Sequence, residues 1–362
     1  MIKVILYGPQ PPFFSYGGPV RSLNSLRKVL SLRFHTICIS PNKHLNGDIA
    51  NYDSKNKIIY SSYPFSTLVY NCLKHPRSVV WFNSFFNYKL VFLLIFSRLG
   101  FCKVILSPRG ELSIAAIETS KSKFKYFYIK IIQGLISSRK VFFHATDSIE
   151  LNDIKKFFRT KKTKIIPNIS TQKYHHNNCY ENNFVFFSRI SKKKGLLELL
   201  NFIKSENLKI NLDIYGFKED FDYWTSCQKL IEGLKGVNYC GELPKGSIEH
   251  LISKYTFFIL PTYNENFGHA IFEAIALGLV PILSKETTPF DKDIDKLVGL
   301  NFDLTSSTSL RNSLVKAKSF TRKEIDIQRE RLYDYFNKLL KQQQLYSQQY
   351  ITFITNIIDN NE

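Results

Sequence analysis

Two glutamates in one short segment are the residues best placed for chemistry. Glu265 and Glu273 belong to the stretch PTYNENFGHAIFE, residues 261–273, which follows the apolar run Phe257–Leu260. The run predicts a buried strand, and Gly268 predicts a turn into a helix that carries Glu273. Ligands of open α/β sheets bind where strands end and helices begin, because free N–H groups there favour anions. Glu273 can then accept two vicinal hydroxyls, as on a ribose, or else simply face solvent.

A second segment carries cations after a similar apolar run. In FVFFSRISKKKGLL, residues 184–197, Arg189 and Lys194 follow the predicted strand Phe184–Ser188. A guanidinium fork and a point-charge ammonium together neutralise a diphosphate well. The alternative for the SKKK stretch is a solvated turn, which is our interpretation of Lys192 and Lys193.

Three further positions come from the first half of the chain. Gly17 and Gly18 lie in a loop after the predicted strand Lys3–Tyr7, and a glycine pair lets backbone approach a ligand closely. Arg109 follows another predicted strand in the stretch SPRG, where it can meet a phosphate or form a structural ion pair. For His144 we favour a buried position in the core in which the hydrogen bonds of the ring are satisfied.

The elements that must position these residues alternate between short apolar runs and longer helical patterns. Runs such as VFF and FFIL are typical of strands buried on both faces, so the pattern predicts two doubly wound α/β units. The polar, aperiodic residues 169–183 are the expected linker, and apolar spacings of three and four predict a helix over 329–358. The predicted strands are Lys3–Tyr7, Thr36–Ser40, Val79–Phe82, Lys103–Ser107, Val141–Ala145, Lys164–Ile166, Phe184–Ser188, Asn211–Tyr215, Val237–Cys240, Phe257–Leu260, Val280–Leu283 and Gly299–Phe302.

Charge separates the two halves. The 362-residue chain carries a net charge of +20, of which residues 1–170 hold +19 (26 Lys and Arg against 7 Asp and Glu). Basic residues interleave with aromatic and aliphatic ones over 121–140, and 155–164 adds more, a pattern that suits an anionic bilayer or an ordinary core-facing helix with a solvated outer face. The scattered cysteines and the absence of a signal-like or 20-residue apolar run predict a cytoplasmic chain with reduced, buried thiols.

The frame P-T-x-x-E-x-F-G-x-x-x-x-E-A, with Arg189 and Lys194 upstream and SPRG before them, resembles retaining GT-B glycosyltransferases of family 4, of the bacterial surface-polysaccharide type. The resemblance implies an α/β GT-B fold, with two Rossmann-like domains facing across a cleft and a C-terminal helix crossing back. It implies an acceptor-binding domain over 1–168, a nucleotide-sugar-binding domain over 183–335, and a helix over 336–362 that packs on the first domain.

The resemblance also implies roles for the site residues. Arg189 and Lys194 would bind the donor diphosphate, Glu273 the ribose, and Gly17, Gly18 and Arg109 phosphates; Glu265 would hold the donor sugar with the backbone of Asn266, Phe267 and Gly268. The donor is a nucleoside-diphosphate sugar, with no cofactor, no metal and no general base. Pro167-Asn168 resembles a family junction motif, although Ile169 replaces its glycine.

The expected acceptor is a glycan linked to undecaprenyl pyrophosphate, used in O-antigen, capsule or exopolysaccharide synthesis by an enzyme peripheral on the inner face of the plasma membrane. Two alternatives stay open. The charge also suits a nucleic-acid-binding protein, although no RNA-recognition or zinc-finger spacing supports one. The same fold with different chemistry would give a GT-B epimerase or an inverting transferase; the two glutamates separated by seven residues argue against both, and product stereochemistry decides.

Overall fold

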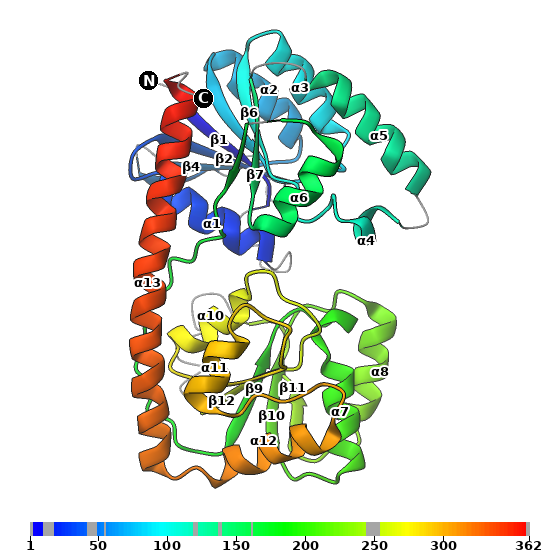
Figure 1. Cartoon of the computed structure of the whole chain (residues 1–362), viewed down its shortest axis with the longest axis vertical. Helices are drawn as coiled ribbons and strands as arrows, with labels where there is room; N and C mark the ends of the chain where they lie inside the picture. The colour runs from blue at the N-terminus through cyan, green and yellow to red at the C-terminus, as the bar shows by residue number, and fades with distance from the viewer. Residues whose placement is uncertain are drawn as a thin grey trace. The chain divides into compact units, whose positions relative to one another are not determined.

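The computed structural model describes residues 3–9, 18–41, 49–53, 56–118, 122–136, 140–160, 162–243 and 254–359, without the side chains of residues 19, 49–53, 115 and 122. The chain divides into two compact units (Figure 1). Unit 1 comprises Met1–Thr171 with Gln343–Glu362, and unit 2 comprises Gln172–Gln342.

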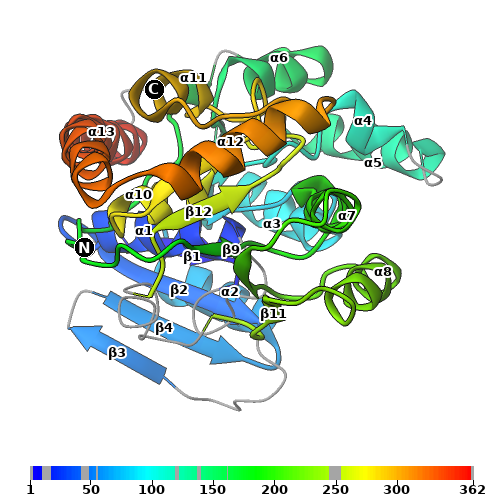
Figure 2. The ribbon, with the colours of Figure 1, turned by 90° about the horizontal axis from the view of Figure 1, so that it is seen from below.

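Unit 1 is built on an eight-stranded sheet in the order β3-β4-β2-β1-β5-β6-β7-β8. Its strands pair in parallel except β3, which runs antiparallel to β4 at the edge (Figure 2). The strands are β1 (Lys3–Tyr7), β2 (His35–Pro41), β3 (Ile49–Asp53), β4 (Asn56–Ser61), β5 (Ser78–Phe82), β6 (Cys102–Leu106), β7 (Val141–Ala145) and β8 (Thr163–Ile165).

Helices cover both faces of this sheet, so strands such as β5 and β7 are buried throughout. One face packs on α2 (Pro64–Lys74), α3 (Lys89–Arg98), α5 (Ser122–Leu135) and α6 (Ser148–Phe157), and α4 (Ile114–Ile117) lies next to α5. The other face packs on α1 (Gly18–Leu30) and on the end of the C-terminal helix.

Unit 2 has an all-parallel sheet in the order β11-β10-β9-β12-β13 around a single core. Its strands are β9 (Asn183–Phe187), β10 (Asn211–Tyr215), β11 (Val237–Tyr239), β12 (Phe257–Leu260) and β13 (Val280–Leu283). Its helices are η2 (Lys192–Lys194), α7 (Leu196–Ser205), α8 (Phe221–Ile231), α10 (His269–Ala276), α11 (Asp291–Val298) and α12 (Ser307–Ser319).

The C-terminal helix α13 (Arg322–Ile358) belongs to both units. Leu332 and Phe336 are buried in the core of unit 2, whereas Tyr350, Phe353 and Ile357 are buried in unit 1. Helix α13 begins at Arg322, seven residues before the predicted start at Arg329. The boundary between the two units falls inside this helix, between Gln342 and Gln343.

The strand predictions hold except at three places. Gly299–Phe302 forms only an isolated bridge, from Phe302 to Ser284, and the sequence analysis did not predict β3 and β4. The expected linker has no regular structure up to residue 182, and Asn183 already begins β9; from Gln172 onward it belongs to unit 2. Asn177 is buried there, where its side chain donates to the Tyr255 carbonyl at 3.0 Å and accepts from Arg329 at 3.1 Å.

Candidate active site

The candidate site in unit 2 lies at a topological switch point. The chain leaves β9 for β10 on one side and returns as β12 on the other, and β9 pairs with both strands in parallel. The loops that follow β9 and β12 therefore begin side by side at one edge of the sheet, and the chain continues from them in opposite directions. Open α/β sheets bind ligands at this position.

Glycine allows these loops to touch. At Gly195, φ is +68° and a Cβ atom would lie 1.9 Å from the carbonyl oxygen of Pro261, so no larger side chain fits without a backbone shift. The carbonyl of Lys193 then accepts hydrogen bonds from Thr262 Oγ1 at 3.1 Å and from Tyr263 N at 2.9 Å. The cationic turn after β9 is thereby held against the loop after β12.

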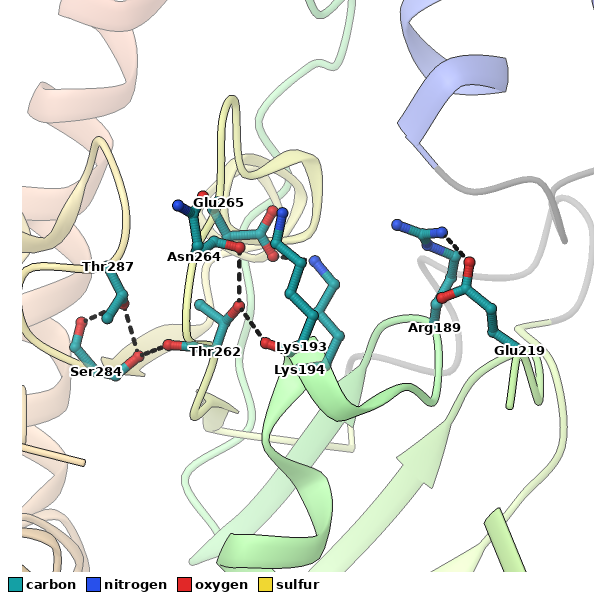
Figure 3. Close-up of polar contacts among 9 residues, drawn as sticks. All are labelled: Arg189, Lys193, Lys194, Glu219, Thr262, Asn264, Glu265, Ser284 and Thr287. Atoms are coloured by element: carbon teal, nitrogen blue, oxygen red, sulfur yellow. Dashed lines mark hydrogen bonds and ion pairs between the residues drawn. The ribbon is translucent and has the colours of Figure 1, made fainter. Parts of the chain in front are cut away.

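This contact brings Lys194 and Glu265 together in an ion pair (Figure 3). Their side chains are only 9% and 11% exposed. Burial lowers the pKa of Lys194, and the charges of Arg189 and Lys193 lower it further, while Glu265 opposes this shift. Both residues were predicted as site residues that bind different parts of the donor, but their pairing was not predicted.

Arg189 forms a second ion pair, with Glu219, which the sequence analysis missed. Both side chains are partly exposed, and Figure 3 shows this pair beside the Lys194–Glu265 pair and separate from it. Glu219 follows β10, the strand next to β9. A signal was available, since an acidic residue just beyond the neighbouring strand reaches the same sheet edge in a parallel sheet.

A series of hydrogen-bonded hydroxyl groups holds the loop that carries Glu265. Ser284 Oγ donates to the Thr262 carbonyl at 2.6 Å and lies 2.8 Å from Thr287 Oγ1 (Figure 3). The Thr287 carbonyl accepts from the backbone N–H of Glu265 at 2.8 Å. Ser284 and Thr287 follow β13 and were not predicted as site residues. Three loops from adjacent strands are thus joined by hydrogen bonds.

Glu273 lies on α10 and is 6% exposed, which excludes the solvent-facing alternative. Gly268 precedes the helix with φ +71°, the left-handed conformation that the predicted turn requires. Asn266 is exposed in the loop, and the ring of Phe267 packs at 4.5 Å from His269. The ligand role expected of Phe267 concerns its backbone and stays a prediction.

In unit 1, Arg109 lies at the carboxyl end of β6. Its guanidinium donates to the side-chain oxygens of Asn83 and Asn168. The neighbouring carboxylates are already occupied: Glu111 accepts the backbone N–H groups of Phe85 and Phe86 at 2.7 Å, and Glu150 accepts that of Gly110 at 2.9 Å. Among the residues described, no carboxylate pairs with Arg109, so the structural ion pair considered for it does not form.

His144 is fully buried in unit 1, as the core interpretation expects. Its ring lies 2.7 Å from Ser107 Oγ and 3.0 Å from the Tyr350 hydroxyl of α13. Burial, and then the charge of Arg109, lower its pKa well below the usual range.

Two other predicted positions are only partly described. Gly18 is the first residue of α1, whereas Gly17 lies outside the described residues.

No group of three or more metal-binding side chains occurs within the described ranges. Asp-x-Asp spacings, which often bind metals, do occur in the sequence at 220–222, 291–293 and 293–295. In the last two, each carboxylate has a protein partner: Asp291 the backbone of Glu286, Asp293 the Tyr335 hydroxyl, and Asp295 the side chain of Lys285. All six cysteines are free, and Cys240 is exposed, contrary to the expectation that the thiols are buried.

The two α/β units and the shared C-terminal helix constitute a GT-B fold. Residues 171–319 match the model of a family described as "Glycosyl transferases group 1". The matched region covers nearly all of unit 2 and contains every site residue described above for that unit. Unit 2 is therefore a glycosyltransferase group 1 domain.

Solved structures share the fold over nearly the whole chain. Sucrose-phosphate synthase from Thermosynechococcus elongatus has a TM-score of 0.68 at 15% identity, covering 97% of this chain and 100% of that one. HepE from Anabaena in complex with UDP has 0.62 at 16%, covering 99% of each chain. WaaG, a glycosyltransferase involved in lipopolysaccharide biosynthesis, has 0.61 at 16%, covering 93% and 95%. No curated protein sequence matches this chain.

Proposed function

We propose that this chain is a retaining, metal-independent glycosyltransferase that takes a sugar from a nucleoside-diphosphate donor. The observation that carries the proposal is the buried Lys194–Glu265 pair at the β9/β12 switch point, in the same domain as the buried Glu273. The UDP complex of HepE, which shares this fold, supports a nucleotide as the ligand.

The two ion pairs suggest how a donor is received. Lys194 and Arg189 each hold a carboxylate, Glu265 and Glu219, and a donor diphosphate would replace these carboxylates as their anionic partner. Glu265 then becomes available to accept hydrogen bonds from the donor sugar. Glu273 binds the ribose hydroxyls. The two cations stabilise the charge that develops on the leaving diphosphate, which also takes the proton of the acceptor hydroxyl.

The proposed acceptor is a glycan carried on undecaprenyl pyrophosphate, and it binds to unit 1. The concentration of positive charge in residues 1–170 supports this assignment, and Arg109, which donates to the side-chain amide oxygens of Asn83 and Asn168, is a candidate to bind an acceptor phosphate. A role in O-antigen, capsule or exopolysaccharide synthesis, on the inner face of the plasma membrane, accords with the structural likeness to WaaG. Within the described residues, no helix is long and apolar enough to cross a bilayer.

A pair of isosteric variants tests the donor site. A thermal-shift screen of nucleotide sugars first identifies the donor. In calorimetric titration with UDP, Glu273→Gln should then bind UDP about 10- to 100-fold more weakly than the wild type, because the charged group that accepts hydrogen bonds from two hydroxyls is lost. Glu265→Gln, the matched isosteric variant, removes the carboxylate that the diphosphate would displace from Lys194, so it should not lower UDP affinity but should lose sugar transfer. Unchanged UDP affinity in Glu273→Gln would remove Glu273 from the site.

The transfer reaction tests the remaining parts of the proposal. With undecaprenyl-linked acceptors, NMR of the product should show the anomeric configuration of the donor retained, and rates should be unaffected by EDTA. An inverted product would support the inverting alternative, and a C2-inverted sugar without transfer would support an epimerase. Salt-dependent retention on DNA, without protection by any nucleotide sugar, would instead support nucleic-acid binding.

A further inference from the structure

Helix α3 in unit 1 exposes an unusual surface. Its sequence, KLVFLLIFSR, is apolar around most of its circumference, a pattern typical of a fully buried helix. Only one side is buried, through Leu90, Leu93 and Leu94. The opposite side carries Tyr88, Phe92, Ile95 and Leu99, whose spacings of four, three and four place them in one stripe. Each of these four side chains is between 40% and 69% exposed.

The helices on either side of α3 continue this exposed layer. Phe65 of α2 packs on Phe92 with ring centroids 6.0 Å apart, and α5 also contacts α3. On α5, Phe124 and Phe127 are 79% and 65% exposed, and Ile131 follows on the same side. We define the α2–α3–α5 face as the exposed apolar residues of this layer: Tyr63, Tyr70, Leu73, Tyr88, Phe92, Ile95, Leu99, Phe124, Tyr126, Phe127 and Ile131.

The charges on this layer are of one sign. None of α2, α3 and α5 contains an acidic residue, while Lys74, Arg98, Lys123 and Lys130 are exposed on them. Between Asp53 and Asp147 the sequence has only two acidic residues, Glu111 and Glu118. The carboxylate of Glu111 accepts hydrogen bonds from the backbone of Phe85 and Phe86. On these three helices the exposed apolar side chains are accompanied only by cations, a combination that complements an anionic membrane.

We propose that the α2–α3–α5 face docks on an anionic phospholipid bilayer, with its phenylalanine, leucine and isoleucine side chains inserted below the headgroups and its lysines and arginines on the phosphates. Its tyrosines suit the boundary between headgroups and acyl chains, where an apolar ring and a polar hydroxyl are both satisfied. This inference rests on the proposed function, in which the acceptor is carried on a lipid, and it adds the surface by which the chain binds the membrane. It differs from attraction by charge alone, because insertion of side chains leaves part of the binding resistant to salt.

The experiment is vesicle sedimentation of the full chain without any sugar donor. Vesicles contain equal parts of phosphatidylcholine and phosphatidylglycerol, with pure phosphatidylcholine for comparison. The triple variant Phe92→Ser, Phe124→Ser, Phe127→Ser should lower the partition coefficient about tenfold or more at low salt, and should abolish the fraction that remains bound in high salt. Neutralising Lys123 and Lys130 to Gln should weaken binding to the anionic vesicles about fivefold per residue, with little effect on pure phosphatidylcholine.

Leu345→Ser provides the matched control, because Leu345 is exposed on the unit 1 part of α13 and is not a member of the face. It should sediment like the wild type. Equal sedimentation of the wild type with both vesicle types, or of the triple variant and the wild type, would overturn the inference. A wild-type dimer in solution that the triple variant dissociates would assign the face to a second copy of the chain and would also overturn it. UDP titration of each variant keeps this test separate from the donor site: loss of vesicle binding with normal UDP affinity concerns the face alone.

Discussion

The ion pair between Lys194 and Glu265 can be tested by a double-mutant cycle of Lys194→Met, Glu265→Gln and the double variant. Both side chains are about nine-tenths buried, so removing one partner leaves a charge that water cannot reach. Breaking a buried pair in this way typically costs about 3–5 kcal/mol of unfolding free energy. The double variant should cost less than the sum of the two single variants, because it leaves no buried charge unpaired.

The pH dependence of the same variants carries a sign that can be checked. The pKa of Lys194 is already lowered by burial, and Glu265 opposes that shift, so the pKa should fall further in Glu265→Gln. Between the folded and unfolded pKa values, the unfolded chain then binds more protons than the folded chain. The stability of Glu265→Gln should therefore rise with pH relative to that of Lys194→Met, by up to about 1.4 kcal/mol per pH unit below pH 10.5.

The two tryptophans make the assay specific to one unit. Trp224 is buried in unit 2 and Trp81 in unit 1. In a Trp81→Phe background, the fluorescence of Trp224 during urea unfolding reports unit 2 by itself. Additive single variants that each cost less than about 1 kcal/mol would show that the pair is not a buried contact. Equal pH slopes in Glu265→Gln and Lys194→Met would show that Lys194 keeps its ordinary pKa.

Three further predictions concern other contacts. His144 stays neutral in the folded chain, so unit 1 should lose about 1.4 kcal/mol of stability per pH unit below pH 6.5. The variant His144→Gln should remove this pH dependence, measured by Trp81 fluorescence in a Trp224→Phe background. An unchanged slope would contradict the buried neutral ring. Gly195→Ala should cost more than about 2 kcal/mol in urea unfolding and weaken UDP binding, because the added Cβ meets the Pro261 carbonyl; wild-type stability would refute this crowding. Thr262→Val should lower kcat with little change in UDP affinity, and Thr262→Ser should restore kcat; equal rates in the two variants would show that the hydrogen bond to Lys193 has no positioning role.

Much of the fold follows from local sequence pattern. Strands such as β1, β7, β10 and β12 lie where their apolar runs predict them, because strands buried on both faces need continuous apolar sequence. The edge strand β3 and its neighbour β4 were missed for the same reason, since IANYD and NKIIYS mix polar and apolar residues as strands at or near an edge do. Gly299–Phe302 is apolar enough to suggest a strand, but it forms only one bridge, at Phe302.

The sequence by itself was sufficient to place Glu265, Glu273, Arg189 and Lys194 near one sheet edge, because parallel strands bring all of their carboxyl ends together. Only the tertiary structure decided their partners. Glu219, Ser284 and Thr287 enter the site because β10 and β13 lie beside the strands that carry the predicted residues, and strand order is not encoded in any local pattern. The exposure of α3 has the same origin: an apolar helix is expected to be buried, and only the neighbouring elements determine which of its sides is left uncovered.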